Sequence, residues 1–150
     1  MNSSKWLLKC LSLAALLITL PGCMTSMEPS VYNARPLAGP GPGRALVVLY
    51  RESQFGGSVI PFGISEDGRS LGRLGNGHYV RVETTPGRHS FTASSEAKET
   101  KSFPVEAGRT YYLRVGVHEG LFIARPHLTL TDPQEGASAV ARMHQDAPRQ

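Results

Sequence analysis

Apolar and polar residues alternate along most of the chain after its N-terminal third. In 109–118 (R-T-Y-Y-L-R-V-G-V-H), every second residue from Tyr111 to Val117 is apolar. The same alternation runs through 78–83 and 125–131. Because successive side chains of a strand point to opposite faces of a sheet, a period of two is typical of strands with one face on a core and the other in water. The pattern predicts strands here rather than helices.

Turn residues interrupt the alternation about every ten residues, which is the spacing of short strands in sandwiches and barrels. The turns include Asp67-Gly68, Asn76-Gly77, Pro86-Gly87, Gly108 and Glu119-Gly120. We therefore expect an all-β fold, an antiparallel β-sandwich of about seven to eight strands. The expected strands are 45–51, 58–64, 69–74, 78–83, 88–94, 100–105, 110–117 and 124–131.

The apolar faces of these strands predict one hydrophobic core. Residues 45–51 (A-L-V-V-L-Y-R) form a mostly apolar run that is long enough for a strand and too short for a typical helix. The expected core includes Leu46, Val48, Phe62, Leu74, Val80, Val82, Phe91, Phe103, Leu113, Val115, Leu128 and Leu130.

A short helix is expected after the last strand. Asp132 can cap its N-terminus, Pro133 suits the first helical position, and Glu135 lies at the third. The pattern predicts a helix over 133 to about 143, which Gly136 weakens. The residues expected on its apolar side are Ala137, Val140 and Ala141.

The N-terminal twenty residues follow another pattern. Lys5 and Lys9 give a positive start, and residues 10–20 are apolar except for two hydroxyl side chains. Eleven residues of helix span about 16 Å, too little for a hydrocarbon core of about 30 Å. A charged start before a short apolar run is typical of a secretory signal peptide, which we expect over 1–22.

Residues 17–26 (L-I-T-L-P-G-C-M-T-S) contain Leu20, Gly22 and Cys23 in the order of a lipobox. The segment resembles that of bacterial lipoproteins, although Pro21 stands where Ala or Ser is common. The resemblance implies cleavage before Cys23 and acylation of its thiol, and two or three acyl chains anchor a protein firmly. The alternatives are an ordinary signal peptide with an incidental cysteine and an uncleaved N-terminal anchor.

Cysteine use agrees with lipidation. Cys10 would leave with the signal peptide and Cys23 would carry the lipid, so no disulfide is expected in the folded part. Residues 23–43 are rich in proline and glycine and lack periodicity, which predicts a tether. The β-sandwich is then expected over 44–131, and the short helix and tail over 132–150.

Charge and motifs argue against several classes of function. The net charge is +4 and no run of Lys and Arg occurs, so nucleic-acid binding has little support. G-x-S-x-G and phosphate-loop motifs are absent from the sequence. We expect no enzymatic activity, no cofactor and no metal site, and a turn or packing role for His89. No paired-ligand spacing is present among His78, His89, His118, His127 and His144.

Polar side chains of three predicted strands would share one solvated face if the strands are neighbours. Arginine binds carboxylate or phosphate groups through two hydrogen bonds, and tyrosine adds rigid contact area. We expect this face to bind an anionic envelope component or an envelope protein, whereas ordinary cross-strand pairing is the alternative. Its members are Tyr79, Arg81, Tyr112, Arg114, Arg125 and His127.

Several short motifs follow one another between residues 45 and 131: Y-R at 50–51, D-G-R-S-L-G-R-L-G-N-G-H-Y at 67–79, P-G-R-H at 86–89, A-G-R-T-Y-Y-L-R-V at 107–115 and R-P-H-L at 125–128. In this order they resemble a family of small uncharacterised bacterial lipoproteins with a domain of unknown function. The central part is also similar to PEGA-type envelope modules. The resemblance implies a β-sandwich at the cell envelope and implies no reaction.

We therefore expect a bacterial envelope lipoprotein whose β-sandwich is a non-catalytic binding or accessory module tethered to a membrane. Met24 follows the acylated cysteine, and where an aspartate there directs sorting, its absence favours the periplasmic side of the outer membrane. The alternatives are a structural or stress-related lipoprotein without a specific ligand, and an enzyme that acts on envelope polymers.

Overall fold

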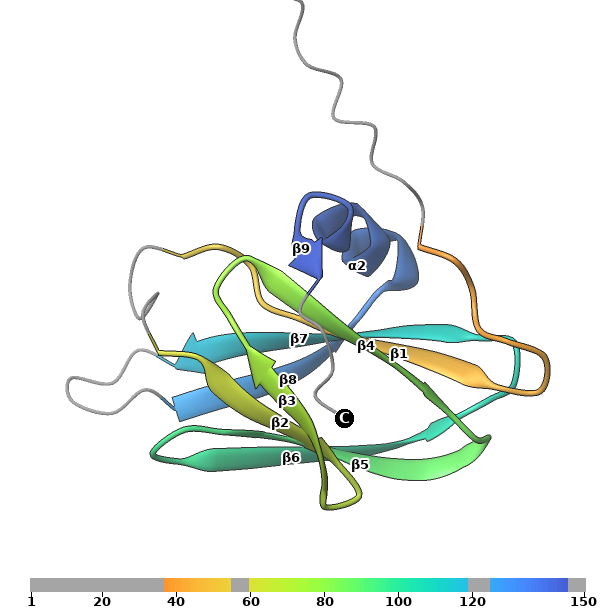
Figure 1. The fold of residues 1–150 in the computed structure, drawn as a ribbon, viewed down its shortest axis with the longest axis horizontal. Helices are drawn as coiled ribbons and strands as arrows, with labels where there is room; N and C mark the ends of the chain where they lie inside the picture. Colours follow the sequence, from red (N-terminus) through yellow and green to blue (C-terminus); the bar gives the residue numbers. More distant parts are fainter. Residues whose placement is uncertain (1–36, 55–59, 119–124, 146–150) are drawn as a thin grey trace, which may run out of the picture. The chain divides into compact units, whose positions relative to one another are not determined.

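The described part of the chain forms two β-sheets packed face to face, with one helix on the outer face of the larger sheet (Figure 1). A computed structural model describes residues 37–54, 60–118 and 125–145, all within the second of the two units of the chain, Tyr32–Gln150. Its elements are β1 (Ala45–Tyr50), β2 (Phe62–Glu66), β3 (Arg69–Leu74), β4 (His78–Thr84), β5 (Gly87–Ser94), β6 (Lys98–Val105), β7 (Thr110–His118), β8 (Arg125–Thr131), α2 (Pro133–Val140) and β9 (His144–Gln145).

The larger sheet has five strands in the order β8-β7-β1-β4-β9, and the smaller has four in the order β3-β2-β5-β6. β1 pairs in parallel with β7, and β4 with β9, while the other pairs are antiparallel. The expected β-sandwich is confirmed. The described residues contain nine strands, and one sheet is mixed rather than antiparallel.

The strand boundaries agree with the sequence pattern to within two residues, except at β2. The pattern predicted 58–64, whereas β2 is Phe62–Glu66 and residues 58–59 lie outside the described part. β2 continues to Glu66 because the two residues of the Asp67-Gly68 turn both have positive φ, 47° and 82°. A two-residue turn of this kind matches the twist of an antiparallel pair, so Glu66 pairs directly with Arg69.

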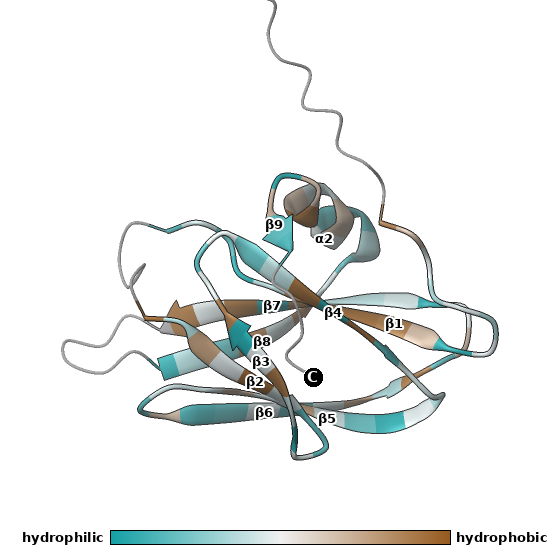
Figure 2. Cartoon of the chain, viewed as in Figure 1, coloured by the Kyte–Doolittle hydropathy of each residue, from teal (hydrophilic) through white to brown (hydrophobic). Residues whose placement is uncertain are grey.

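The main core lies between the two sheets. Figure 2 shows hydrophobic positions along β1, β4 and β7 of the larger sheet and along β2 of the smaller one. Phe103 links the two sheets, with ring centroids 5.4 Å from Phe91 and 5.7 Å from Tyr111. Each fully buried Val, Leu, Ile or Phe side chain contributes roughly 1.5–3 kcal/mol relative to an exposed one.

β1 is buried on both of its faces, and each of its six residues is 0% exposed. Ala45, Val47 and Leu49 face the main core. Leu46, Val48 and Tyr50 face the other way, into a second cluster that Ala139 and Val140 of α2 cover. The single core predicted from the sequence is therefore two, because α2 packs on the outer face of the sheet.

The N-terminus of α2 is capped as the sequence predicts. The Asp132 carboxylate accepts hydrogen bonds from the backbone N–H groups of Gln134 and Glu135. The predicted apolar side is confirmed at Val140, which is buried, and was wrong at Ala137, which is exposed, while Gly136 and Ala139 are buried as well. The helix ends at Val140, three residues earlier than the pattern predicted. Gly136 lies against Tyr112, and a Cβ at this position would overlap the tyrosine side chain.

Leu130 was predicted in the core, and this prediction was wrong because its side chain is 41% exposed. Leu130 pairs with Leu113 and therefore points to the same side of the sheet as that buried residue. However, β8 is the outermost strand of its sheet, so Leu130 has a neighbouring strand on one side only. Alternation predicts the direction of a side chain and does not predict how far an edge position is covered.

Candidate functional site

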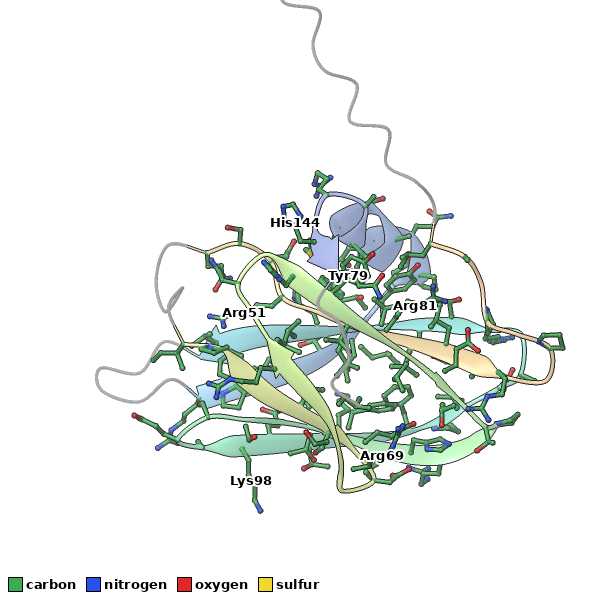
Figure 3. The ribbon with its side chains drawn as sticks, viewed as in Figure 1. Arg51, Arg69, Tyr79, Arg81, Lys98 and His144 are labelled. Atoms are coloured by element: carbon green, nitrogen blue, oxygen red, sulfur yellow. The ribbon has the colours of Figure 1, made fainter. Side chains whose placement is uncertain are left out.

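The six residues predicted to form a polar face do project from one face of the larger sheet. Cross-strand partners share a face, and Val48 of β1 pairs with both Arg81 and Tyr112. Tyr50 pairs in the same way with Tyr79 and Arg114. On β8, Arg125 and His127 pair with His118 and Gly116 of β7 and so lie on this face too. This is the α2 side of the sheet, where Figure 3 shows Tyr79 and Arg81.

The two tyrosines are not solvated, which corrects the prediction of an Arg/Tyr-rich solvent face. Tyr79 is 9% exposed and Tyr112 is 6% exposed, because α2 packs over the middle of the sheet. Burial raises the pKa of Tyr112 above its ordinary value. The tyrosine rings therefore belong to the second core.

Three basic side chains of this face contact acidic side chains of the same chain. Arg81 lies 3.6 Å from the Glu83 carboxylate, and His127 Nδ1 lies 3.2 Å from Glu99 Oε2. Arg114 NH1 lies 3.7 Å from both Glu52 Oε2 and Glu135 Oε1, and its side chain is 40% exposed. Exposed ion pairs of this kind contribute about 0–1 kcal/mol, so they are easily exchanged for other partners.

A hollow of about 270 Å³ lies beside these ion pairs, and we call it the Arg114 hollow. Arg114 and His127, both members of the predicted face, meet Glu52 there. Two neighbouring strands and the segment after β1 thus bring charges of both signs to one depression. Its lining is Glu52, Gln54, Arg114, Val115, Gly116, Val117, His127 and Thr129.

A second hollow, of about 450 Å³, lies between the C-terminal end of α2, β9 and the β3–β4 turn. His78 and His144 face each other across the parallel pair of β4 and β9, with ring centroids 5.7 Å apart. Arg142 and Met143 complete its helical side. Figure 3 shows His144 beside α2.

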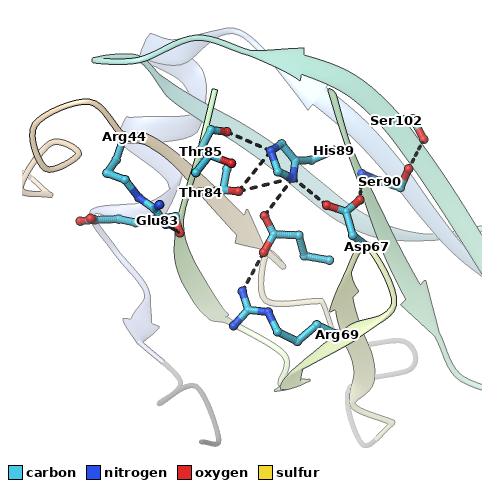
Figure 4. Close-up of polar contacts among 10 residues, drawn as sticks. Arg44, Asp67, Arg69, Glu83, Thr84, Thr85, His89, Ser90 and Ser102 are labelled. Carbon is cyan, nitrogen blue, oxygen red and sulfur yellow. Dashed lines mark hydrogen bonds and ion pairs between the residues drawn. The ribbon is translucent and has the colours of Figure 1, made fainter. Parts of the chain in front are cut away.

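A polar cluster that the sequence did not predict lies at one end of the sandwich (Figure 4). Glu66 ends β2, Asp67 begins the β2–β3 turn, and His89 lies near the start of β5. His89 Nδ1 lies 2.7 Å from Asp67 Oδ2 and 3.5 Å from Glu66 Oε1. The sequence assigned His89 a turn or packing role, and nothing in its spacing joins it to Asp67, 22 residues earlier.

Hydrogen bonds hold each member of this cluster in place. The Ser90 backbone N–H donates to Asp67 Oδ1 at 2.8 Å, and this bond together with His89 holds the pKa of the Asp67 carboxyl below its usual value. Arg69 donates to Glu66 Oε2 at 2.8 Å. The nearby Thr84 hydroxyl lies 3.3 Å from His89 Nε2, but Thr84 is only 5% exposed, which gives a substrate little access to it.

These features define a class: a small all-β sandwich module with a capping helix on one sheet, a charged hollow beside that helix and a His–carboxylate cluster at one end. Among the described residues, no helix is both long and apolar enough to cross a membrane. The chain belongs to the family described as "Protein of unknown function (DUF2846)", which matches residues 42–126, from just before β1 to the start of β8. The predicted membership of a domain family of unknown function is thereby confirmed.

The chain is also similar to an "Uncharacterized protein" of Haemophilus influenzae (strain ATCC 51907 / DSM 11121 / KW20 / Rd). The two are 22% identical over 137 residues, which cover 89% of this chain and 81% of that protein. No solved structure gives a significant match.

Proposed function

We propose that this protein is a bacterial envelope lipoprotein, lipidated at Cys23, whose β-sandwich is a non-catalytic binding module. The observation that carries the proposal is the order of signals in the sequence. Two lysines, a short apolar run and Leu20-Pro21-Gly22-Cys23 come first, followed by a Pro/Gly-rich segment. Residues 1–36 lie outside the described part, whereas the Pro/Gly-rich residues 39–43 belong to it and directly precede β1.

The spacing between Cys23 and Leu37 suits this arrangement. Leu37 packs against the second core and the Ala38 carbonyl accepts a hydrogen bond from Arg81, so the tether expected over 23–43 is proposed to end at residue 36. A flexible chain of about thirteen residues has a root-mean-square length of about 20 Å, enough to hold a domain clear of lipid headgroups. The similarity of the central motifs to PEGA-type modules adds support for an envelope location. The absence of aspartate after Cys23 favours the periplasmic side of the outer membrane as the location of the lipid anchor.

The Arg114 hollow is the part of the predicted face best suited to a partner. Arg114 makes two long, exposed contacts with carboxylates, and a carboxylate or phosphate of a ligand can replace them with a shorter two-point contact. Arg125 is exposed at the start of the neighbouring strand. We therefore assign the module an acidic envelope protein as partner, bound by Arg81, Arg114, Arg125 and His127.

Metabolic labelling with a clickable fatty acid tests the anchor. The full chain expressed in a Gram-negative host should incorporate the label, and Cys23→Ser should lose it because the acylated thiol is gone. Cys10→Ser is the matched control and should keep the label, since Cys10 would leave with the signal peptide. Label retained by Cys23→Ser, or lost only in Cys10→Ser, would contradict lipidation at Cys23.

A further inference from the structure

Three metal-ligating side chains converge at the end of the sandwich that Figure 4 shows in close-up. Glu66, Asp67 and His89 each offer one ligand atom, and these atoms all lie within 4.8 Å of one another. In the part of the chain that the structure describes, this is the one group of three or more such side chains close enough to share an ion. The group takes no part in the proposed membrane anchor or partner face.

His89 Nδ1 faces both carboxylates of the cluster. His89 Nε2 lies 2.9 Å from the Thr85 carbonyl oxygen, which can only accept, so this nitrogen donates. Nδ1 lies within hydrogen-bond distance of Asp67 Oδ2, at 2.7 Å, and 3.5 Å from Glu66 Oε1. Two carboxylates that converge on one imidazole nitrogen favour a cation among them, and a metal ion there would take the place of a proton on Nδ1.

Glu66 is the second, independent indication of a ligand. Its side chain is 5% exposed, and its Oε1 atom has no hydrogen-bond partner. A buried carboxylate oxygen without a partner is costly, because it has lost its water without replacement. The oxygen points to His89 Nδ1, into the space that a bound ion would occupy.

In each of the three side chains, the polar atom that faces away from the proposed site makes a hydrogen bond that fixes the orientation of the side chain. The Thr85 carbonyl binds His89 Nε2, Arg69 binds Glu66 Oε2, and the Ser90 N–H binds Asp67 Oδ1. Metal-binding histidines and carboxylates in proteins are held by outer partners of this kind, which fix the ring tautomer and leave the other atom for the ion.

We propose that Glu66, Asp67 and His89 form a binding site for one divalent transition-metal ion of borderline softness, Zn²⁺ being the type. One imidazole nitrogen beside two carboxylates suits Zn²⁺ better than Ca²⁺ or Mg²⁺, which prefer oxygen ligands alone. The Asp67 side chain is 50% exposed, so water completes the coordination. Tetrahedral bonds of about 2.0–2.2 Å put ligand atoms about 3.4 Å apart, so Asp67 Oδ2, now 2.7 Å from His89 Nδ1, has to move about 0.7 Å away from it.

Zinc titration of the full chain tests the site. The protein is purified in detergent without a polyhistidine tag, stripped with EDTA, and titrated with Zn²⁺ by calorimetry and with Co²⁺ by visible absorption. One ion per chain is expected, and Zn²⁺ at a hundred times its Kd should raise the Tm by about 10 °C or more. His89→Gln and Asp67→Asn should each weaken binding at least tenfold.

The variants distinguish Zn²⁺ binding at this site from Zn²⁺ binding at other histidines. Asparagine tolerates the positive φ of residue 67 and can still accept from the Ser90 N–H, so Asp67→Asn should fold even if His89→Gln does not. His127→Gln is the control and should bind Zn²⁺ as the unaltered chain does. Absence of stoichiometric binding, a Tm unaffected by Zn²⁺, or unchanged affinity in Asp67→Asn would overturn the proposal. None of these outcomes bears on fatty-acid labelling at Cys23.

Discussion

Gly136 occupies the closest approach between α2 and the larger sheet. In an exposed helix, replacement of glycine by alanine adds about 1 kcal/mol of stability, since alanine has the higher helix propensity. Here a Cβ would overlap the Tyr112 side chain. We predict that Gly136→Ala lowers the free energy of unfolding by about 1–3 kcal/mol, as overpacking does, in urea titrations.

Ser138→Ala is the matched control for that prediction. Residue 138 lies on the exposed side of the same helix, so its substitution changes helix propensity without any clash. It should raise the free energy of unfolding by a few tenths of a kcal/mol, about the propensity difference. If Gly136→Ala stabilised the chain like Ser138→Ala, the close packing of α2 on Tyr112 would be wrong.

Tyr112 predicts how stability changes at alkaline pH. Burial raises its pKa in the folded state above the ordinary value of 10.0. A raised pKa gives stability that is fully present below the unfolded pKa and is lost as the pH rises through the folded value. Tyr112→Phe should therefore lose less stability than the unaltered chain between about pH 9 and pH 11, in Tm measurements.

Part of that loss should remain in Tyr112→Phe, because burial also raises the pKa of Tyr50. At neutral pH the variant keeps the ring that packs against Gly136, so a small change in Tm is expected there. Equal alkaline losses in both proteins would show that Tyr112 ionises as freely in the folded chain as in the unfolded one.

The sequence predicted which way these side chains point and not what covers them. Tyr79 and Tyr112 alternate with core residues, which correctly puts them on the opposite face of the sheet. That face is dry at its centre because α2, distant along the chain from Tyr79, folds back over it. Local periodicity holds no information about such a contact. For the same reason it could not predict that Leu130 is exposed.

At the scale of elements, the stability of α2 depends on the capping of its first turn. Asp132 Oδ1 accepts from the N–H of Gln134 at 2.8 Å and from that of Glu135 at 3.4 Å. We predict that Asp132→Ala lowers the free energy of unfolding by about 1 kcal/mol, measured in urea, because two helix N–H groups lose their acceptor. Asp132→Asn keeps an acceptor and should cost only a few tenths. Equal losses in both variants would contradict the capping role.

Strands and turns were largely predictable because their signals are local. The Asp67-Gly68 turn is marked by residue types that accept positive φ, and alternation marks the strands on either side. β9 was not predicted, since two residues are too few for a period. The cluster of Glu66, Asp67 and His89 escaped prediction because β2 and β5 bring it together only when they pair.

At the scale of the whole molecule, the α2 side of the larger sheet is the face proposed to meet a partner. If the protein is anchored as proposed, we predict that replacing Arg81, Arg114 and Arg125 together with Gln removes its specific cross-links in native membranes. The Tm should change little, because these arginines are at least partly exposed and their ion pairs contribute little. Mass spectrometry of the cross-linked products measures the loss.

The control carries the same change of charge on the other sheet. Arg73, Arg88 and Lys101 are all exposed there, and their joint replacement with Gln should leave the cross-links in place. Equal loss in both triple variants would indicate attraction by net charge alone. Cross-links to lipid only, in the unaltered chain, would favour a structural lipoprotein without a specific ligand.

The position of β1 has a consequence for the order in which the domain folds. β1 is the first of the described strands and the middle strand of its sheet, between β4 and a parallel partner, β7, that begins only at Thr110. Hairpins such as β2–β3 and β7–β8 form between strands that are close along the chain. The pairing of β1 with β7, in contrast, joins residues more than sixty positions apart. Contacts so distant along a chain slow folding to milliseconds or seconds. A nascent chain that lacks β7 therefore cannot complete its central sheet, and until β7 is made the most apolar strand of the domain stays available to chaperones.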